Sequence, residues 1–157
     1  MNPLEPPLRP VHWIEPQAGV LAWLPGSAPL RFVIVTSRRT GRWVFPKGGV
    51  DQGMTPSEAA RQEALEEAGV LGLIDAEPLG RYRVAKIRPP LIWTVDVSLY
   101  AMEIEEVMDV WIEAGQRQRR FVTLDEAKTL MEEPQMLALA RRLVDRHADG
   151  TLSAARD

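Results

Sequence analysis

The chain has 157 residues, enough for one domain with a hydrophobic core and too few for two ordinary domains. Apolar residues make up 45% and charged residues 26%, which excludes wholesale disorder. Cysteine is absent, histidine occurs only at His12 and His147, and the formal net charge is −3, so a thiolate zinc site, a Ser-His-Asp triad and a DNA-binding role are not expected.

The two ends differ in composition from the middle of the chain. Residues 1–15 are rich in proline and predict a flexible arm, and residues 150–157 predict a flexible tail. The domain is therefore expected to cover residues 16–149. No run of 18 apolar residues and no secretory signal is present, so we expect a cytoplasmic protein without a membrane span.

The first half of the domain predicts three strands and one helix. Residues 18–24, 30–37 and 42–45 are the strands, separated by a Pro-Gly pair and by a turn at 38–41. A loop follows over residues 46–55. Thr55 and Glu58 form a capping box with Pro56 at the first helical position, and Gly69 stands where the helix over 56–68 should end.

The second half predicts three more strands and two helices. Strands are expected at 80–84, 91–101 and 119–122, and a second capping box, Thr123 with Glu126, starts a helix that runs to about 132. Pro134 starts the last helix. The order β-β-β-α-β-β-β-α-α predicts an α/β fold, a mixed sheet with helices on both sides. Strict alternation in 91–101 places one set of side chains on a single face: Leu91, Trp93, Val95, Val97, Leu99 and Ala101.

Three acidic residues on the first helix are the main chemical signal. Glu63, Glu66 and Glu67 fall within an arc of about 100° on one helical face. Carboxylates this close repel one another unless a cation lies between them, and Mg²⁺ prefers such oxygen ligands. A solvated acidic face is the alternative, and it is the commoner reason for such a triplet.

The residues around this triplet resemble the Nudix box, Gly-x5-Glu-x7-Arg-Glu-U-x-Glu-Glu-x-Gly-U, where U is a bulky aliphatic residue. Three positions depart: Met54 replaces the first Glu, Gln62 the Arg and Ala64 the first aliphatic residue. In the family that Glu and Arg usually form a salt bridge. Losing both partners leaves no unpaired charge, so we interpret the change as neutral. Six of the nine defined positions match: Gly48, Glu63, Glu66, Glu67, Gly69 and Val70.

Two flanking segments are similar to the diphosphoinositol polyphosphate phosphohydrolase branch of the family. They are residues 36–49 before the box, and Trp111-x5-Arg117-x-Arg119-x-Phe121 before the second capped helix. The likeness covers roughly residues 19–142. It implies the Nudix α/β/α sandwich and a Mg²⁺-dependent pyrophosphohydrolase, with Mn²⁺ as the alternative ion.

The resemblance also implies roles for the acidic residues. Glu63 and Glu67 would be metal ligands together with the carbonyl of Gly48, and Glu66 would be the general base or a ligand through water. One further acid from outside the box is expected. The sequence leaves five candidates open: Glu103, Glu105, Glu106, Asp109 and Glu113.

Basic residues on the flanking loops are expected to hold the rest of the substrate. Arg119 belongs to the same basic set, and Trp43 and Trp111 are open candidates for stacking on a base, whereas Trp93 is expected in the core. The predicted substrate-binding residues are Ser37, Arg38, Arg42, Lys47, Lys86, Arg88 and Arg117.

The expected substrate is a phosphorylated small molecule: diphosphoinositol polyphosphate, diadenosine polyphosphate or a related nucleotide. An ADP-ribose or capped-RNA pyrophosphohydrolase, or a noncatalytic nucleotide-binding regulator, remains the alternative. The chain is expected to be a monomer or a homodimer. Substrate identity is not decided by the motif, because one fold hosts many sites.

Overall fold

The computed structural model describes residues 12–152, and in this part of the chain the strands form one mixed sheet. The sheet runs in the order β3-β2-β1-β7-β5, with β4 added to β1, β6 to β7 and β8 to β2. The strands are β1 (His12–Leu24), β2 (Arg31–Thr36), β3 (Trp43–Val44), β4 (Lys47–Gly49), β5 (Val70–Ile74), β6 (Gly80–Arg88), β7 (Leu91–Val107) and β8 (Arg119–Val122).

The centre of the sheet is a long parallel pair formed by β1 and β7. Their register runs from His12 opposite Ile92 to Trp23 opposite Glu103. All other pairings are antiparallel, including β4 against β1, which sets Gly48 opposite Ala18. The short β4 therefore brings the start of the Nudix-like segment onto the middle of the sheet.

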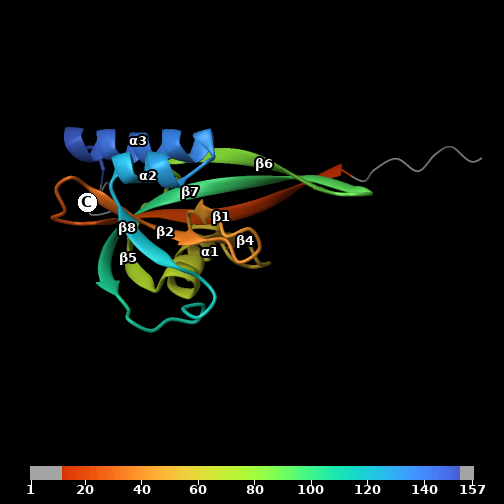
Figure 1. Cartoon of the computed structure of the whole chain (residues 1–157), viewed down its shortest axis with the longest axis horizontal. Coiled ribbons are helices and arrows are strands. Elements are labelled where there is room, and N and C mark those ends of the chain that lie inside the picture. The colour runs from red at the N-terminus through yellow and green to blue at the C-terminus, as the bar shows by residue number, and fades with distance from the viewer. Residues whose placement is uncertain (1–11, 153–157) are drawn as a thin grey trace, which may run out of the picture.

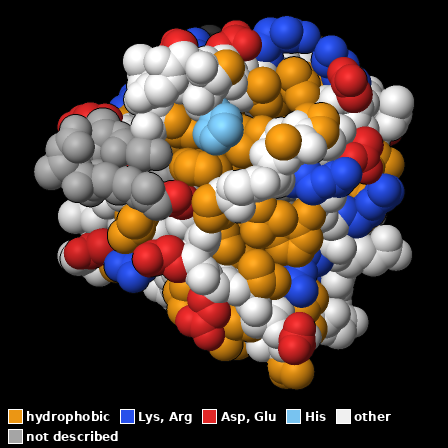
Figure 2. All heavy atoms as spheres, turned by 90° about the vertical axis from the view of Figure 1, so that its left-hand side faces the viewer, with side chains coloured by type: hydrophobic (Ala, Val, Ile, Leu, Met, Phe, Trp, Pro, Cys, Tyr) orange, Lys and Arg blue, Asp and Glu red, His pale blue; other side chains and the backbone are white. Residues whose placement is uncertain are grey.

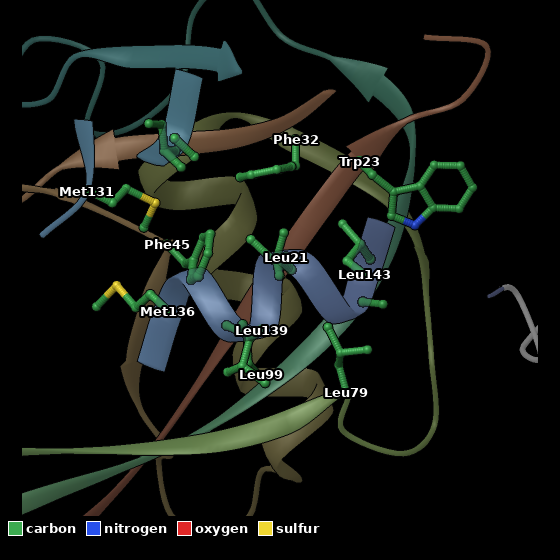
Figure 3. Close-up of a cluster of buried hydrophobic side chains, with 14 of the residues drawn as sticks. Leu21, Trp23, Phe32, Phe45, Leu79, Leu99, Met131, Met136, Leu139 and Leu143 are labelled. Carbon is green, nitrogen blue, oxygen red and sulfur yellow. The ribbon is translucent and has the colours of Figure 1, made fainter. Parts of the chain in front are cut away.

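Each face of the sheet is covered by helices, as predicted. On one face α2 (Leu124–Leu130) and α3 (Pro134–Asp149) enclose the larger core cluster, shown in Figure 3 around Leu21, Phe45 and Leu139. On the other face α1 (Pro56–Glu63) and its continuation η1 (Ala64–Ala68) cover a cluster that includes Val33 and Met102. Figure 1 shows α2 and α3 above the sheet and α1 below it. The α/β sandwich expected from the sequence is confirmed.

The local signals for helix ends are also confirmed. Thr55 and Thr123 both accept a hydrogen bond from the backbone N–H three residues on, and Glu58 and Glu126 reach back to complete the two capping boxes. Gly69 has a φ of 62°, the left-handed conformation that glycine adopts without strain. The alternation in β7 is correct as well, because Val95, Val97, Leu99 and Ala101 all belong to the larger core cluster.

Several strands differ from their predicted bounds. Residues 12–15 belong to β1 and not to the arm, since backbone pairing with β7 holds them despite Pro16. The strands β6 and β7 run on to Arg88 and Val107, and β4 and β5 were missed. Beyond the helices, β1, β6 and β7 continue as a three-stranded projection, drawn to the right in Figure 1, on which Trp13 stacks against Trp93 at 5.1 Å.

The rest of the predicted arm and most of the predicted tail, residues 1–11 and 153–157, lie outside the described residues. Within the described part of the tail, Leu152 packs into the larger core cluster. No helix between residues 12 and 152 is long and apolar enough to cross a membrane. Figure 2 shows the end of the molecule opposite the projection, where hydrophobic side chains are bordered by both acidic and basic ones.

Candidate active site

The acidic residues lie where the first helix changes from α to π geometry. Glu63 is the last residue of α1, whereas Glu66 and Glu67 lie within the π-helical η1. Such π turns are frequent at functional sites. The three side chains have different environments: Glu67 is buried, and the half-exposed Glu66 accepts a hydrogen bond from Gln62 Nε2 at 2.9 Å. The triplet is therefore not one uniform acidic face.

Glu63 and Glu67 form a close carboxyl pair against the backbone of β4. A hydrogen bond links the two carboxyl groups, while burial and the charge of Glu66 raise the pKa of Glu63. The Glu63 carboxyl group lies so near Gly48 that a Cβ built on this glycine would come within 2.4 Å of it. A side chain at position 48 would thus displace the carboxylate, so the box glycine is required for packing.

Glu67 is held by donors on both of its oxygens. The backbone N–H of Lys47 donates to Oε2 at 3.1 Å, and Arg117 Nη2 donates to Oε1 at 3.1 Å. Burial raises the pKa of Glu67 to about 8, Arg117 opposes this shift, and the neighbouring Glu63 adds to it. Without a metal ion, the carboxyl pair therefore retains a proton near neutral pH.

Arg117 links this pair to an acid outside the box. Its Nη2 also donates to Glu113 Oε1 at 3.3 Å, and its Nη1 donates to the carbonyl of Thr36 at 2.9 Å. Glu113 has a second ion pair with Arg38, at 3.2 Å. Of the five acids that the sequence leaves open, Glu113 is the one joined to the box through this arginine; Glu103 is buried on β7, and Glu105, Glu106 and Asp109 are exposed.

A cavity of about 640 Å³ opens beside Glu67, between β3, the projection and the start of α3. Cationic side chains outnumber acidic ones in its lining by seven to three, and Arg39 is a lining residue that the sequence did not single out. Burial and the nearby Lys86 lower the pKa of Lys47, whose Nζ donates to Gln17 Oε1 at 2.9 Å. All seven predicted substrate residues line this cavity: Ser37, Arg38, Arg42, Lys47, Lys86, Arg88 and Arg117. Gly48, Glu63 and Glu66 lie outside the lining.

Trp43 and Trp93 also line the cavity, whereas Trp111 lies outside the lining and packs against the end of η1. The Trp111 indole N–H donates to the carbonyl of Glu67 at 2.9 Å, and Arg119 lies 4.0 Å over its ring. Arg119 donates to the carbonyls of Ala68 and Met108. Arg119 is therefore a cap on the box helix and not part of the cavity, because the helix end leaves carbonyl groups that need donors.

The two changed box positions carry no unpaired charge. Met54 is half-buried and packs against the smaller core cluster, and Gln62 makes the hydrogen bond to Glu66. The neutral replacement of the family's usual ion pair thus has a packing contact at one end and a hydrogen bond at the other.

The donor set suits a hard divalent cation, although its three acids do not converge. Within residues 12–152, no group of three His, Cys, Asp or Glu side chains is arranged to hold a metal ion together. The Glu63–Glu67 pair and the backbone of Gly48 nevertheless meet at one place, where two carboxylates repel each other without a cation or a proton. These residues fit Mg²⁺ with water completing its coordination.

Comparison with known proteins identifies a family and several relatives of this sequence. A family model described as the NUDIX domain matches residues 15–144. Nudix hydrolase 4 of Arabidopsis thaliana is 34% identical over 103 residues, 66% of this chain and 48% of that protein. Diphosphoinositol polyphosphate phosphohydrolase 3-beta of Bos taurus is 28% identical, over 62% of this chain and 58% of its own.

The same fold occurs in solved structures. An Ap4A hydrolase of C. elegans, solved as a binary complex, superposes with a TM-score of 0.65 at 19% identity, covering 86% of this chain and 98% of its own. The chain spans about half the length of the Arabidopsis relatives that it matches.

Proposed function

Because this chain belongs to the Nudix family, we propose that it is a Mg²⁺-dependent pyrophosphohydrolase that cleaves a diphosphate linkage in a highly phosphorylated small molecule. The observation that carries this proposal is the position of Glu67, which belongs both to the carboxyl pair and to the lining of the cationic cavity. A phosphorylated group in the cavity therefore lies next to the residues that suit the metal.

In this proposal Glu63, Glu67 and the Gly48 carbonyl would hold the metal. When bound, the ion offsets the charge of the diphosphate and acidifies water. The protein fixes the ligands in advance, since the Lys47 N–H and Arg117 each hold one oxygen of Glu67. Glu66, whose carboxyl is oriented by Gln62, takes the proton as water attacks phosphorus.

The cavity cations bind the phosphate groups that do not react. Arg38, Arg42, Lys47, Lys86 and Arg88 come from separate loops and strands, so they surround a ligand and do not form one flat patch. The Ser37 hydroxyl adds a neutral donor. Seven lining side chains are cationic and three are acidic, which favours a polyanion over a substrate with a single diphosphate.

The names of similar proteins support the proposed substrate class. The bovine relative is named a diphosphoinositol polyphosphate phosphohydrolase, and the worm structure is named an Ap4A hydrolase. Both names denote substrates with many phosphate groups. Trp43 and Trp93 on the cavity wall supply an aromatic surface, which favours a dinucleoside polyphosphate among these candidates.

A panel of substrates tests the proposal. Turnover is measured with Mg²⁺ on diphosphoinositol polyphosphate, diadenosine polyphosphate, ADP-ribose and capped RNA. We expect the first two to exceed the others in kcat/KM. A higher kcat/KM for ADP-ribose or capped RNA would contradict the proposed substrate class. Tight binding of a compound without turnover of any would indicate a noncatalytic regulator.

Two matched variants test the roles of the acids. Glu67→Gln is expected to lower turnover by orders of magnitude, because the substitution removes a metal ligand. The circular dichroism spectrum of this variant should stay native. Glu66→Gln is expected to lower kcat by about 10²–10⁴-fold and leave the affinity for Mn²⁺ unchanged. Unchanged turnover in Glu67→Gln would refute its assignment as a ligand.

A further inference from the structure

One nitrogen of Arg117 lies between two carboxylates from different parts of the chain. Nη2 is 3.1 Å from Glu67 Oε1, on η1, and 3.3 Å from Glu113 Oε1, in the segment before β8. All three side chains are buried, with exposed fractions of 9% for Arg117, 7% for Glu67 and 11% for Glu113. The two acids therefore converge on one cationic point.

Convergence of this kind is what holds a divalent ion in proteins. Two buried carboxylates that face one point repel each other strongly unless a positive charge lies between them. Mg²⁺ and Mn²⁺ are bound through one or two such carboxylates with water filling the other positions. Here a guanidinium supplies the positive charge, anchored by its Nη1 on the carbonyl of Thr36.

Two of the three groups also line the cavity, Arg117 and Glu67, whereas Glu113 lies behind the arginine and outside the lining. The Nε atom of Arg117 is buried and has no hydrogen-bond partner among the residues that the structure describes. A purely structural bridge would satisfy that donor, because an unpaired buried N–H costs free energy.

We propose that the Arg117 guanidinium occupies a built-in cation position between Glu67 and Glu113, so that the free protein binds one divalent ion, at Glu63 and Glu67. The inference rests on the proposed function, because it takes the carboxyl pair as the metal site. Removal of the guanidinium frees Glu67 and Glu113 to bind a second ion. Arg117 is then a positioning residue, which limits the number of ions and holds Glu67 in place.

Metal binding measured without substrate tests this. The protein, freed of metal with EDTA, is titrated with Mn²⁺, and the free ion is followed by electron paramagnetic resonance with calorimetry alongside. We expect one ion in the wild type and two in Arg117→Gln. Arg117→Lys keeps a positive charge and is expected to bind one. Arg38→Gln is the matched control, since Arg38 pairs with Glu113 but not with Glu67, and it is expected to bind one.

The outcomes separate the inference from the proposed function. Two ions in the wild type, or one in Arg117→Gln, would overturn the inference and leave the metal site of the enzyme standing. If the wild type binds no ion, both the inference and the metal site of the proposed function are contradicted. If Arg117→Gln does not fold without metal, folding in Mn²⁺ with two bound ions supports the inference, and failure to fold in Mn²⁺ contradicts it.

Discussion

The carboxyl group of Glu67 makes the stability of the metal-free protein depend on pH. Its pKa is about 8 in the folded chain against an ordinary value of 4.5, chiefly because of burial. Between these values the folded form retains a proton that the unfolded form has lost. We therefore expect the free energy of unfolding to fall as the pH rises from about 4.5 to about 8, measured by urea unfolding in EDTA.

Glu67→Gln is the control for this pH effect. The amide does not ionise, so stability in this variant should change much less over the same pH range. An equally steep fall in Glu67→Gln would assign the effect to other groups.

Gly48 and Gly49 offer a matched pair for the space beside Glu63. A Cβ at position 48 would come within 2.4 Å of the Glu63 carboxyl, whereas a Cβ at position 49 would have no atom within 4 Å. We expect Gly48→Ala to lose about 1–3 kcal/mol of unfolding free energy, as overpacking does, and to weaken Mn²⁺ binding. Gly49→Ala should match the wild type in calorimetry and thermal unfolding, and equal behaviour of both variants would refute the close contact.

Among the elements, the loop over residues 108–118 depends on one indole ring. Trp111 donates to the carbonyl of Glu67 and lies against Gly69 and Arg119, so it fixes the loop that carries Glu113 onto the end of η1. Trp111→Phe keeps an aromatic ring and removes the N–H. We expect a loss of about 1–3 kcal/mol in urea unfolding, the cost of an unsatisfied buried acceptor. No change would show that the hydrogen bond is not needed.

The helix ends of this fold can be predicted from the sequence, whereas two of its strands cannot. Thr55, Pro56 and Gly69 act through contacts within a few residues, so their effect can be predicted from the sequence alone. The strand β4 is the sequence Lys-Gly-Gly, with no β-forming residue, and it is extended only because β1 lies beside it. The start of the projection escapes prediction for the same reason, since pairing with β7 holds residues 12–15 in a strand despite Pro16.

The candidate site divides in the same way. The spacing of Glu63, Glu66 and Glu67 leaves a solvated acidic face open, and the resemblance to the Nudix box is what predicts metal chemistry. The basic residues predicted on the flanking loops do line one cavity. The partner of Glu67 cannot be found by spacing, because Arg117 is 50 residues away. The sequence does not distinguish Glu113 from Glu103 as the further acid. Only the folded chain shows that Glu113 contacts Arg117.

For the whole molecule, charge is separated although the net charge is only −3. The cavity lining carries seven cationic side chains and three acidic ones, so the acidic excess lies elsewhere. Attraction of a polyanion into such a cavity weakens when salt screens it. We expect kcat/KM for a polyphosphate substrate to fall steeply between low and high ionic strength. The double variant Lys86→Gln/Arg88→Gln should show a lower value with a shallower salt dependence, and a flat response in the wild type would contradict this.

The parallel pairing of β1 with β7 has a consequence for synthesis. Gly19 lies opposite Leu99, so the first strand of the sheet finds its central neighbour only after 80 further residues have been made. Until then the apolar residues 18–24 of β1 lack the strand that pairs with them along one edge, and closing so long a loop is slow. A ribosome-bound fragment that stops before β7 should thus be recognised by chaperones and cut by proteases, and the chain should become resistant in one step once β7 is released.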